Sequence, residues 1–161
     1  KKELTQLQRV QKTKTGNDKN IALQASWLLK PNDYVFLQGK EQAFAIYPNH
    51  EQDFQRIHKQ LYMRKIGLPL GASAAKNWIP AHEVALSINQ SSAISTIALN
   101  REQALLFLKK DELQIDAPKG WHLVTFDGLS LGWIKSIGNR VNNYLPKHWR
   151  IRMQLPDEDW A

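Results

Sequence analysis

The sequence predicts an α+β protein in which a small N-terminal α/β segment precedes a small β-barrel with helices. The last third holds strand-like stretches on both sides of Asp127-Gly128, a dipeptide typical of tight hairpin turns. The middle of the chain holds helical patterns that begin at capping residues. Hydrophobic residues make up 42% and charged residues 23% of the 161 positions, which is typical of a globular protein.

The N-terminal elements are predicted as follows. Residues 1–14 carry a thin apolar stripe, which indicates a solvated lead-in helix, and residues 21–29 suit a short helix. Residues 34–47 are typical of a β-hairpin. A clearer helix follows, with Asn49 as its expected cap. The face of this helix that we expect to be buried consists of Phe54, Ile57, His58 and Leu61.

The composition of the sequence changes near residue 64, and the short strand predicted there contains Gly67 and Gly71. Pro80 is expected to open a helix, and Thr96 begins a strand-like stretch. Asn100, with a glutamine three residues later, predicts a second capped helix. The last third is predicted to be all β, and several strands at such spacing indicate a small barrel.

These patterns predict three segments. Residues 1–63 form an α/β segment with a basic lead-in, residues 64–153 form the main domain, and residues 154–161 form an acidic tail. The chain lacks an initiator Met, so we expect it to be a piece of a longer protein.

The charge balance predicts a polyanionic partner. Lys and Arg number 22 against 15 Asp and Glu, giving a net charge of +7, although a soluble protein can also simply be basic. The absence of cysteine excludes disulfides, thiolate zinc sites and cysteine nucleophiles. No apolar run of membrane-spanning length and no apolar signal core are present, so we expect a cytoplasmic protein without a membrane partner.

The residues form no catalytic or metal-binding pattern. The histidines are far apart in the sequence, at His50, His58, His82, His122 and His148, and we expect no metal site. His58 and His82 are predicted to be hydrogen-bonded structural histidines. The segment Gly67-Leu-Pro-Leu-Gly71 lacks the Lys-Ser/Thr end of a phosphate-binding loop.

The C-terminal end combines basic residues with aromatic and amide side chains. Such a mixture suits RNA, because cations hold phosphates while aromatics and amides contact bases. The basic members are Lys135, Arg140, Lys147, Arg150 and Arg152, and the others are Trp133, Asn142, Asn143, Tyr144 and Trp149. For Trp133, Tyr144 and Trp149 a place in the core or at the barrel rim is the preferred interpretation, whereas for the basic cluster we prefer a function.

A family resemblance rests on these motifs. The string Gly120-Trp-His-Leu-Val-Thr-Phe-Asp-Gly-Leu-Ser-Leu-Gly-Trp-Ile-Lys135 is followed by Gly-Asn-Arg-Val-Asn-Asn-Tyr-Leu-Pro146-Lys-His-Trp-Arg150. Together they resemble the C-terminal module of Nol/Nop/Sun-type RNA cytosine-C5 methyltransferases, and in particular the bacterial small-subunit ribosomal RNA methyltransferase F group. Gly67-Leu-Pro-Leu-Gly71, Pro80-Ala-His and Leu99-Asn-Arg-Glu-Gln-Ala-Leu-Leu-Phe-Leu108 occur in the expected order.

The resemblance implies a PUA-like domain, which is a β pseudo-barrel with helices that binds RNA, preceded by a smaller α/β segment. It also implies a parent enzyme that binds S-adenosylmethionine and attacks cytosine through cysteine, whereas this chain has no cysteine and no recognisable cofactor fingerprint. We therefore expect neither catalysis by this chain nor a cofactor in it. The positions that the resemblance implies for RNA contact are Lys135, Asn143, Tyr144, Lys147 and Arg150, with Lys76 and Asn77 as weaker additions.

Two functions remain open at this point. The preferred hypothesis is a domain that positions structured RNA, ribosomal or transfer, for an upstream methyltransferase domain of the same parent. The alternative is a protein-interaction or scaffold module that packs on the parent enzyme and touches RNA little. A free-standing enzyme that uses the histidines and carboxylates has no residue pattern in its favour.

Overall fold

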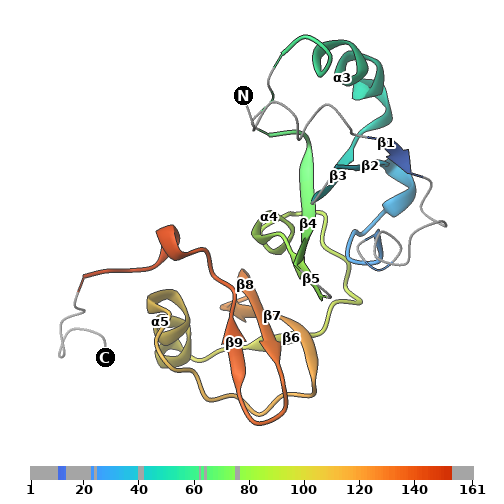
Figure 1. The fold of residues 1–161 in the computed structure, drawn as a ribbon. Coiled ribbons are helices and arrows are strands. Elements are labelled where there is room, and N and C mark those ends of the chain that lie inside the picture. Colours follow the sequence, from blue (N-terminus) through green and yellow to red (C-terminus); the bar gives the residue numbers. More distant parts are fainter. Residues whose placement is uncertain are drawn as a thin grey trace. The chain divides into compact units, whose positions relative to one another are not determined.

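The chain folds into two units, which are Lys1–Ser95 and Thr96–Ala161. The structure, a computed structural model (Figure 1), describes residues 11–13, 23, 25–39, 42–61, 63, 65–74 and 77–153. The predicted acidic tail, 154–161, and most of the predicted lead-in helix lie outside these residues.

The first unit contains a five-stranded antiparallel sheet in the order β1-β2-β3-β4-β5. Its strands are β1 Gln11–Thr13, β2 Val35–Gln38, β3 Gln42–Ile46, β4 Leu68–Ala74 and β5 Asn77–Pro80. The predicted hairpin at 34–47 is confirmed by β2 and β3. The prediction of a lead-in helix was wrong for Gln11–Thr13, because these residues form a strand that pairs with β2. Cross-strand hydrogen bonds there override a thin helical stripe.

The helices of this unit are shorter than the sequence predicts. They are the 3-10 turns η1 Pro31–Asp33 and η2 Pro48–His50, and the helices α3 Glu51–Ile57 and α4 His82–Ala85. The N-cap of α3 is His50 rather than Asn49, because the 3-10 turn η2 occupies the predicted first turn.

The predicted apolar face of α3 is mostly not buried. Phe54 is 4% exposed and packs with Leu37, Phe44, Ile46 and Ile66, whereas Ile57 is 41% and Leu61 65% exposed. The helix ends at Ile57, so Leu61 no longer continues that face. Of the stretch predicted as a helix at 21–29, Leu23 and Ala25 are helical, and Leu28 then forms a bridge with Gln90.

The division between the units differs from the boundary predicted near residue 64. Strand β4 pairs with β3, and β5 pairs with β4, so the segment after residue 64 completes the first sheet. Pro80 ends β5 and does not open the next helix. Within α4, Val84 and Ala85 are fully buried, whereas Ile88, three residues beyond the end of the helix, is 95% exposed.

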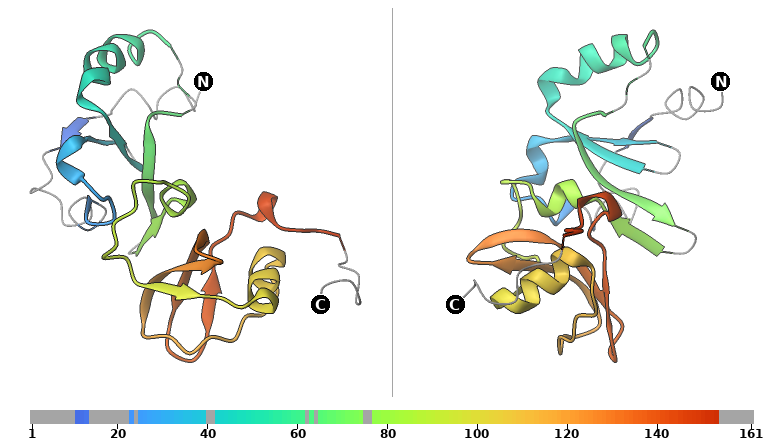
Figure 2. Two further views of the ribbon diagram at one scale, coloured as in Figure 1. Left: turned by 180° about the vertical axis from the view of Figure 1, so that it is seen from behind. Right: turned by 90° about the vertical axis from the view of Figure 1, so that its left-hand side faces the viewer.

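The second unit contains a four-stranded sheet in the order β6-β7-β8-β9, with β6 parallel to β7 and the other pairs antiparallel. Its elements are β6 Thr96–Ala98, α5 Arg101–Lys109, β7 Gly120–Phe126, β8 Leu129–Ser136, β9 Val141–Asn143 and the 3-10 turn η3 Lys147–Trp149. Figure 2 shows α5 beside this sheet in both views. Ala104 and Phe107 of α5 join Val124 of β7 and Ile134 of β8 in the core.

Local sequence determines both ends of α5 and the main hairpin. The predicted cap is confirmed: the Asn100 side chain accepts from the Gln103 amide at 2.8 Å, and the Gln103 side chain accepts from the Asn100 amide at 3.1 Å. The predicted turn is also confirmed, because Asp127 and Gly128 connect β7 and β8 with φ of 48° and 76°. Positive φ at both positions matches the twist of the strands.

The α+β class is confirmed by two sheets with short helices. Among the described residues, none of the helices has both the length and the apolar character needed to cross a membrane. Trp133 is 1% exposed, which confirms its predicted place in the core.

Candidate RNA-binding surface

Two neighbouring groups of side chains in the second unit form the candidate surface. The first group is set by the sheet register, because Trp121 pairs with Lys135 and Lys135 pairs with Asn142. Residues directly opposite each other on neighbouring strands share a face of the sheet. These three side chains therefore lie in a row across β7, β8 and β9.

Trp121, Lys135 and Tyr144 form what we call the aromatic cluster. The Trp121 and Tyr144 rings meet edge to face with centroids 4.5 Å apart. The Lys135 Nζ lies 5.3 Å from the Trp121 ring centroid, within the range of a cation–π interaction. All three residues are half-buried. The cluster therefore combines a fixed cation with partly accessible aromatic rings.

Asn143 joins β9 to α5 through hydrogen bonds within the chain. Its Nδ2 donates to the Phe107 carbonyl oxygen at 2.7 Å, and its Oδ1 accepts from the Leu145 amide at 2.8 Å. Its position between β9 and the following loop gives it a structural role, whatever else it contacts.

Lys110 strengthens the same connection. It follows α5 in the left-handed conformation with φ of 62°, and its Nζ donates to the carbonyl oxygens of Asn143 at 3.1 Å and Leu145 at 2.6 Å. After the loop, the Ile151 amide donates to the Leu108 carbonyl at 3.0 Å. Residues 146–150, which we call the basic loop, are thus attached to the end of α5 on both sides.

The basic loop presents its side chains to solvent. Lys147, His148, Trp149 and Arg150 are all exposed, and the turn is closed by the Trp149 amide, which donates to the Pro146 carbonyl at 3.0 Å. Burial lowers the pKa of Lys110, and the nearby charges of Lys147 and Arg150 lower it further. Lys147 and Arg150 therefore lie close enough to Lys110 to repel its charge.

The charge around this loop is uniformly positive in sequence. No Asp or Glu occurs between Asp127 and Asp157, a stretch that holds five Lys and Arg residues. Arg140 differs from the other basic residues of this stretch, because it lines a polar groove together with Asp111, Glu112 and Asp116. Three carboxylates share this groove with Arg140, whereas the basic loop carries none, so we centre the cationic surface on the basic loop and not on the β8–β9 turn.

The structure brings together five of the seven residues predicted from the sequence. Lys135 and Tyr144 belong to the aromatic cluster, Lys147 and Arg150 to the basic loop, and Asn143 connects the two. Asn77 begins β5 in the first unit, where its backbone pairs with Ala74, and Lys76 lies outside the described residues.

Two contributors were not predicted as site residues. Trp121 carries both ring contacts of the aromatic cluster, and Lys110 connects the loop to α5. Among the described residues, no three His, Asp or Glu side chains are placed to hold a metal ion. The predicted hydrogen bond of His58 is present, because its Nδ1 lies 3.0 Å from the Phe54 carbonyl oxygen.

The second unit is thus a small domain with a mixed sheet, a capped helix and an exposed cationic loop. Residues 94–151, slightly more than a third of the chain, match the family model described as the PUA domain of methyltransferase RsmF. The resemblance predicted from the sequence is therefore confirmed.

Curated relatives agree with this match. The chain is 28% identical over 99 residues to ribosomal RNA small subunit methyltransferase F of Shewanella piezotolerans, covering 60% of this chain and 20% of the relative. It is 25% identical over 125 residues to the protein of the same name from Shewanella loihica, covering 76% and 25%. To the Aeromonas hydrophila protein of this name it is 26% identical over 127 residues, which cover 78% of this chain and 26% of the relative. The chain thus spans about a quarter of the length of these relatives.

Proposed function

We propose that this chain is an RNA-binding accessory region that positions structured RNA, most directly small-subunit ribosomal RNA, for the cytosine-C5 methyltransferase domain of a parent enzyme. The observation that carries the proposal is the basic loop, which is attached to α5 at both ends and presents Lys147 and Arg150 to solvent. A cationic loop held in one conformation loses little entropy when it binds phosphates.

The aromatic cluster adds a second kind of contact. Tyr144 and Trp121 offer ring surface for stacking on a base, and Lys135 offers a charge beside them. We propose Lys135, Tyr144, Lys147 and Arg150 as direct contacts and Asn143 as the residue that sets their spacing. Lys76 and Asn77, in the first unit, are a separate and weaker proposal.

The proposal assigns the chemistry to another part of the parent protein. In the family that the sequence resembles, cysteine attacks the cytosine and S-adenosylmethionine supplies the methyl group, whereas this chain has no cysteine. We therefore propose no cofactor and no turnover for this chain, and a cytoplasmic location where ribosomal RNA is found. We also propose that the four-stranded sheet is part of a PUA pseudo-barrel and that the first unit is the segment that precedes it.

The test is a titration of the purified chain against folded small-subunit ribosomal RNA and an unstructured RNA of equal length at several salt concentrations. We expect log affinity to fall linearly with log salt, with tighter binding to the folded RNA. Equal affinity for both RNAs would contradict positioning of structured RNA.

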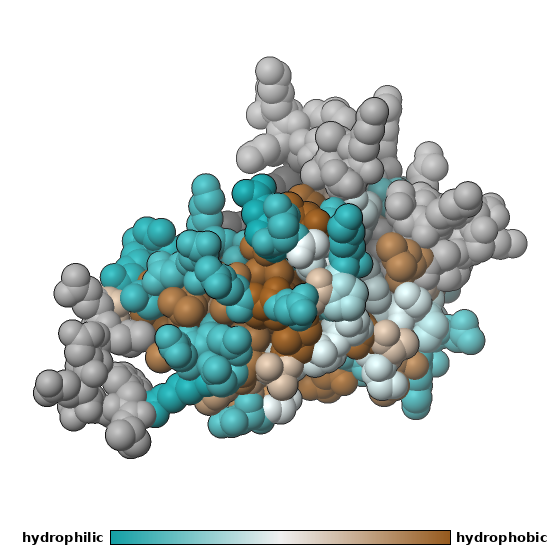
Figure 3. All heavy atoms as spheres, turned by 90° about the horizontal axis from the view of Figure 1, so that it is seen from below, coloured by the Kyte–Doolittle hydropathy of each residue, from teal (hydrophilic) through white to brown (hydrophobic). Residues whose placement is uncertain are grey.

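The scaffold alternative rests on apolar side chains at the surface. Leu129 is 71%, Met153 68% and Trp149 54% exposed. Figure 3 shows one face of the molecule on which hydrophobic residues lie between hydrophilic ones. A mixed face of this kind favours neither function, so the titration decides: absence of RNA binding at low salt would support the scaffold.

A further inference from the structure

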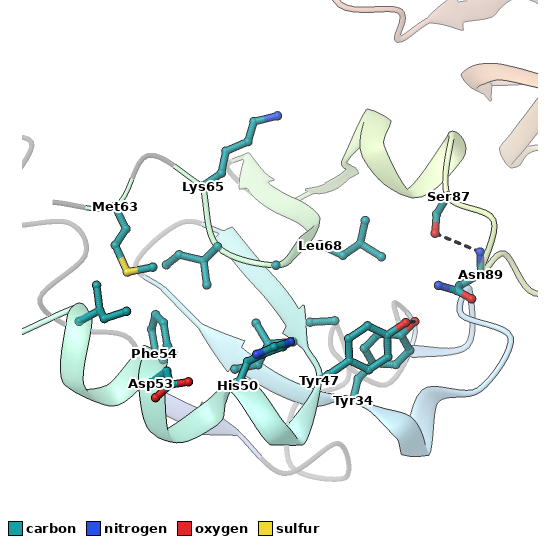
Figure 4. Close-up of a pocket in the computed structure, with 15 residues that line it drawn as sticks. Tyr34, Tyr47, His50, Asp53, Phe54, Met63, Lys65, Leu68, Ser87 and Asn89 are labelled. Carbon is teal, nitrogen blue, oxygen red and sulfur yellow. Dashed lines mark hydrogen bonds between the residues drawn. The ribbon is translucent and has the colours of Figure 1, made fainter. Parts of the chain in front are cut away.

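The first unit contains a cavity of about 520 Å³, a size that small-molecule sites commonly have. Figure 4 shows Tyr47, His50 and Phe54 along one side and Lys65, Leu68 and Ser87 along the other. The inner lining is apolar, with Phe54 and Ile66 each 4% exposed. Asn89 brings a polar side chain to the end of the cavity near Tyr47, whereas the Asp53 carboxylate points away from the cavity (Figure 4).

A stacked tyrosine pair forms part of the lining. The Tyr34 and Tyr47 rings lie 4.9 Å apart at 26°, and their hydroxyl oxygens are 3.4 Å apart. Burial, with the hydrogen bond to Tyr47 next in weight, raises the pKa of Tyr34 to about 12. The contacts between the two rings and the two hydroxyls fix the pair in place, and Tyr47 remains 47% exposed. Ordered aromatic rings are good platforms for stacking a base.

The cavity wall opposite α3 depends on Gly67. This residue has φ of 48°, and a Cβ there would lie 2.3 Å from the Ala45 carbonyl oxygen and 2.6 Å from Ile46 Cγ2. Only glycine allows the chain before β4 to approach β3 this closely. The first glycine of Gly67-Leu-Pro-Leu-Gly71 thus has a role in shaping the cavity.

Lys65 supplies a cation at the rim of the cavity, where its side chain points outward (Figure 4). Its Nζ lies 3.2 Å from Glu83 Oε1, and the two side chains are 77% and 43% exposed. An ion pair this exposed contributes little stability, so Lys65 can exchange Glu83 for a phosphate without a large cost.

We propose that this cavity binds one unpaired nucleobase of the RNA. The base stacks on the tyrosine pair, its edge forms hydrogen bonds with the Asn89 amide beside that pair, and its phosphate contacts Lys65. Amide side chains are among the groups that recognise base edges. The Asn89 amide, together with the cation, favours a base over an apolar protein side chain as the occupant. The inference rests on the proposed RNA-binding function and adds a second contact site to it.

The test follows backbone amide signals by NMR while adenosine, guanosine, cytidine and uridine, and then their monophosphates, are added to the full chain. We expect saturable shifts at Tyr47, His50 and Asn89 with at least one nucleoside, and tighter binding of the matching monophosphate. Tyr47→Ala should weaken nucleoside binding about fivefold or more, whereas Tyr47→Phe should bind like the wild type. Lys65→Ala should remove the advantage of the monophosphate, and Lys59→Ala, an exposed lysine of the same unit outside the cavity lining, should keep it.

Each other outcome is decisive. Absence of saturable shifts with every nucleoside would overturn the inference, as would shifts that Tyr47→Ala leaves unchanged in a variant whose spectrum is otherwise that of the folded chain. If toluene shifts the amide signals of Tyr47, His50 and Asn89 and nucleosides do not, the cavity binds apolar groups and the inference is wrong. The RNA titration of the wild type, run in parallel, separates the two proposals: RNA binding without nucleoside binding refutes only this inference, and loss of RNA binding at low salt refutes the proposed function.

Discussion

Replacing Lys147 and Arg150 with alanine should weaken RNA binding without weakening the fold. Both side chains are exposed, so their removal creates no cavity and uncovers no buried polar group. Their charges contribute to the lowered pKa of Lys110, so their loss should let that pKa rise toward its usual value. The double variant therefore loses the two proposed phosphate contacts, and its folded state also loses the repulsion of these two charges on Lys110.

The size of the effect follows from counterion release. Each lost phosphate contact reduces the steepness of the slope of log affinity against log salt by about 0.7 to 0.9. The slope of the double variant should therefore be shallower than that of the wild type by about 1.4 to 1.8. Between 50 and 200 mM salt, the advantage of the wild type over the variant should therefore shrink by about tenfold. The free energy of unfolding should stay within about 0.5 kcal/mol of the wild type.

The assay is fluorescence anisotropy with labelled ribosomal RNA at four or more salt concentrations, combined with urea unfolding and an NMR titration of the lysine side chains. Arg56→Ala with Lys59→Ala is the matched control, because these two exposed residues in the first unit carry the same total charge. If the control lowers the salt slope as much as Lys147→Ala with Arg150→Ala does, the effect is one of net charge and the basic loop has no special role. An unchanged slope in the double variant would refute the site itself.

Three further predictions concern stability and titration. Lys110→Met should lower the free energy of unfolding by about 1–3 kcal/mol in urea, since the carbonyls of Asn143 and Leu145 lose their donor; an unchanged value would show that the loop does not depend on Lys110. Gly128→Ala should lower the free energy of unfolding by about 1 kcal/mol through backbone strain alone, because no atom lies within 4 Å of the added Cβ. Gly67→Ala should lower it clearly more, because the added Cβ meets backbone atoms of Ala45. Equal losses of stability in the two variants would contradict this comparison. Tyr34 should titrate near pH 12 in ultraviolet absorbance and closer to 10.0 in Tyr47→Phe. Because the folded pKa is the raised one, the stability that Tyr34 contributes should be present below pH 10.0 and lost as the pH rises toward 12; a Tyr34 pKa that Tyr47→Phe leaves unchanged would exclude the hydroxyl contact as a cause.

Elements encoded by short local signals were predicted well. The Asn100 capping box needs only residues three apart, and the Asp127-Gly128 turn needs only two positions that tolerate positive φ. Both features are complete within a few residues, so no distant contact is needed to form them. The hairpin of β2 and β3 belongs to the same group.

Elements that depend on distant partners were not predicted. Gln11–Thr13 is a strand because β2 lies beside it, and the segment after residue 64 belongs to the first unit because β4 pairs with β3. Composition changes at residue 64, but hydrogen bonding between strands continues across that point. A domain boundary based on local composition therefore falls inside the first sheet.

The candidate surface shows the same limit at the level of single side chains. A two-residue turn at Asp127-Gly128 without any irregularity would pair Trp121 with Ile134, which would leave Lys135 on the opposite face of the sheet from Trp121. The register instead shifts between Val124 and Thr125, so Val124 pairs with Gly132 and Trp121 pairs with Lys135. Gly132, with φ of 152°, lies at this bulge, and glycines inside strand patterns often mark such positions. One extra residue in β8 thus decides that a lysine and a tryptophan share a face, and with Tyr144 beside them they form the aromatic cluster that we propose for RNA contact.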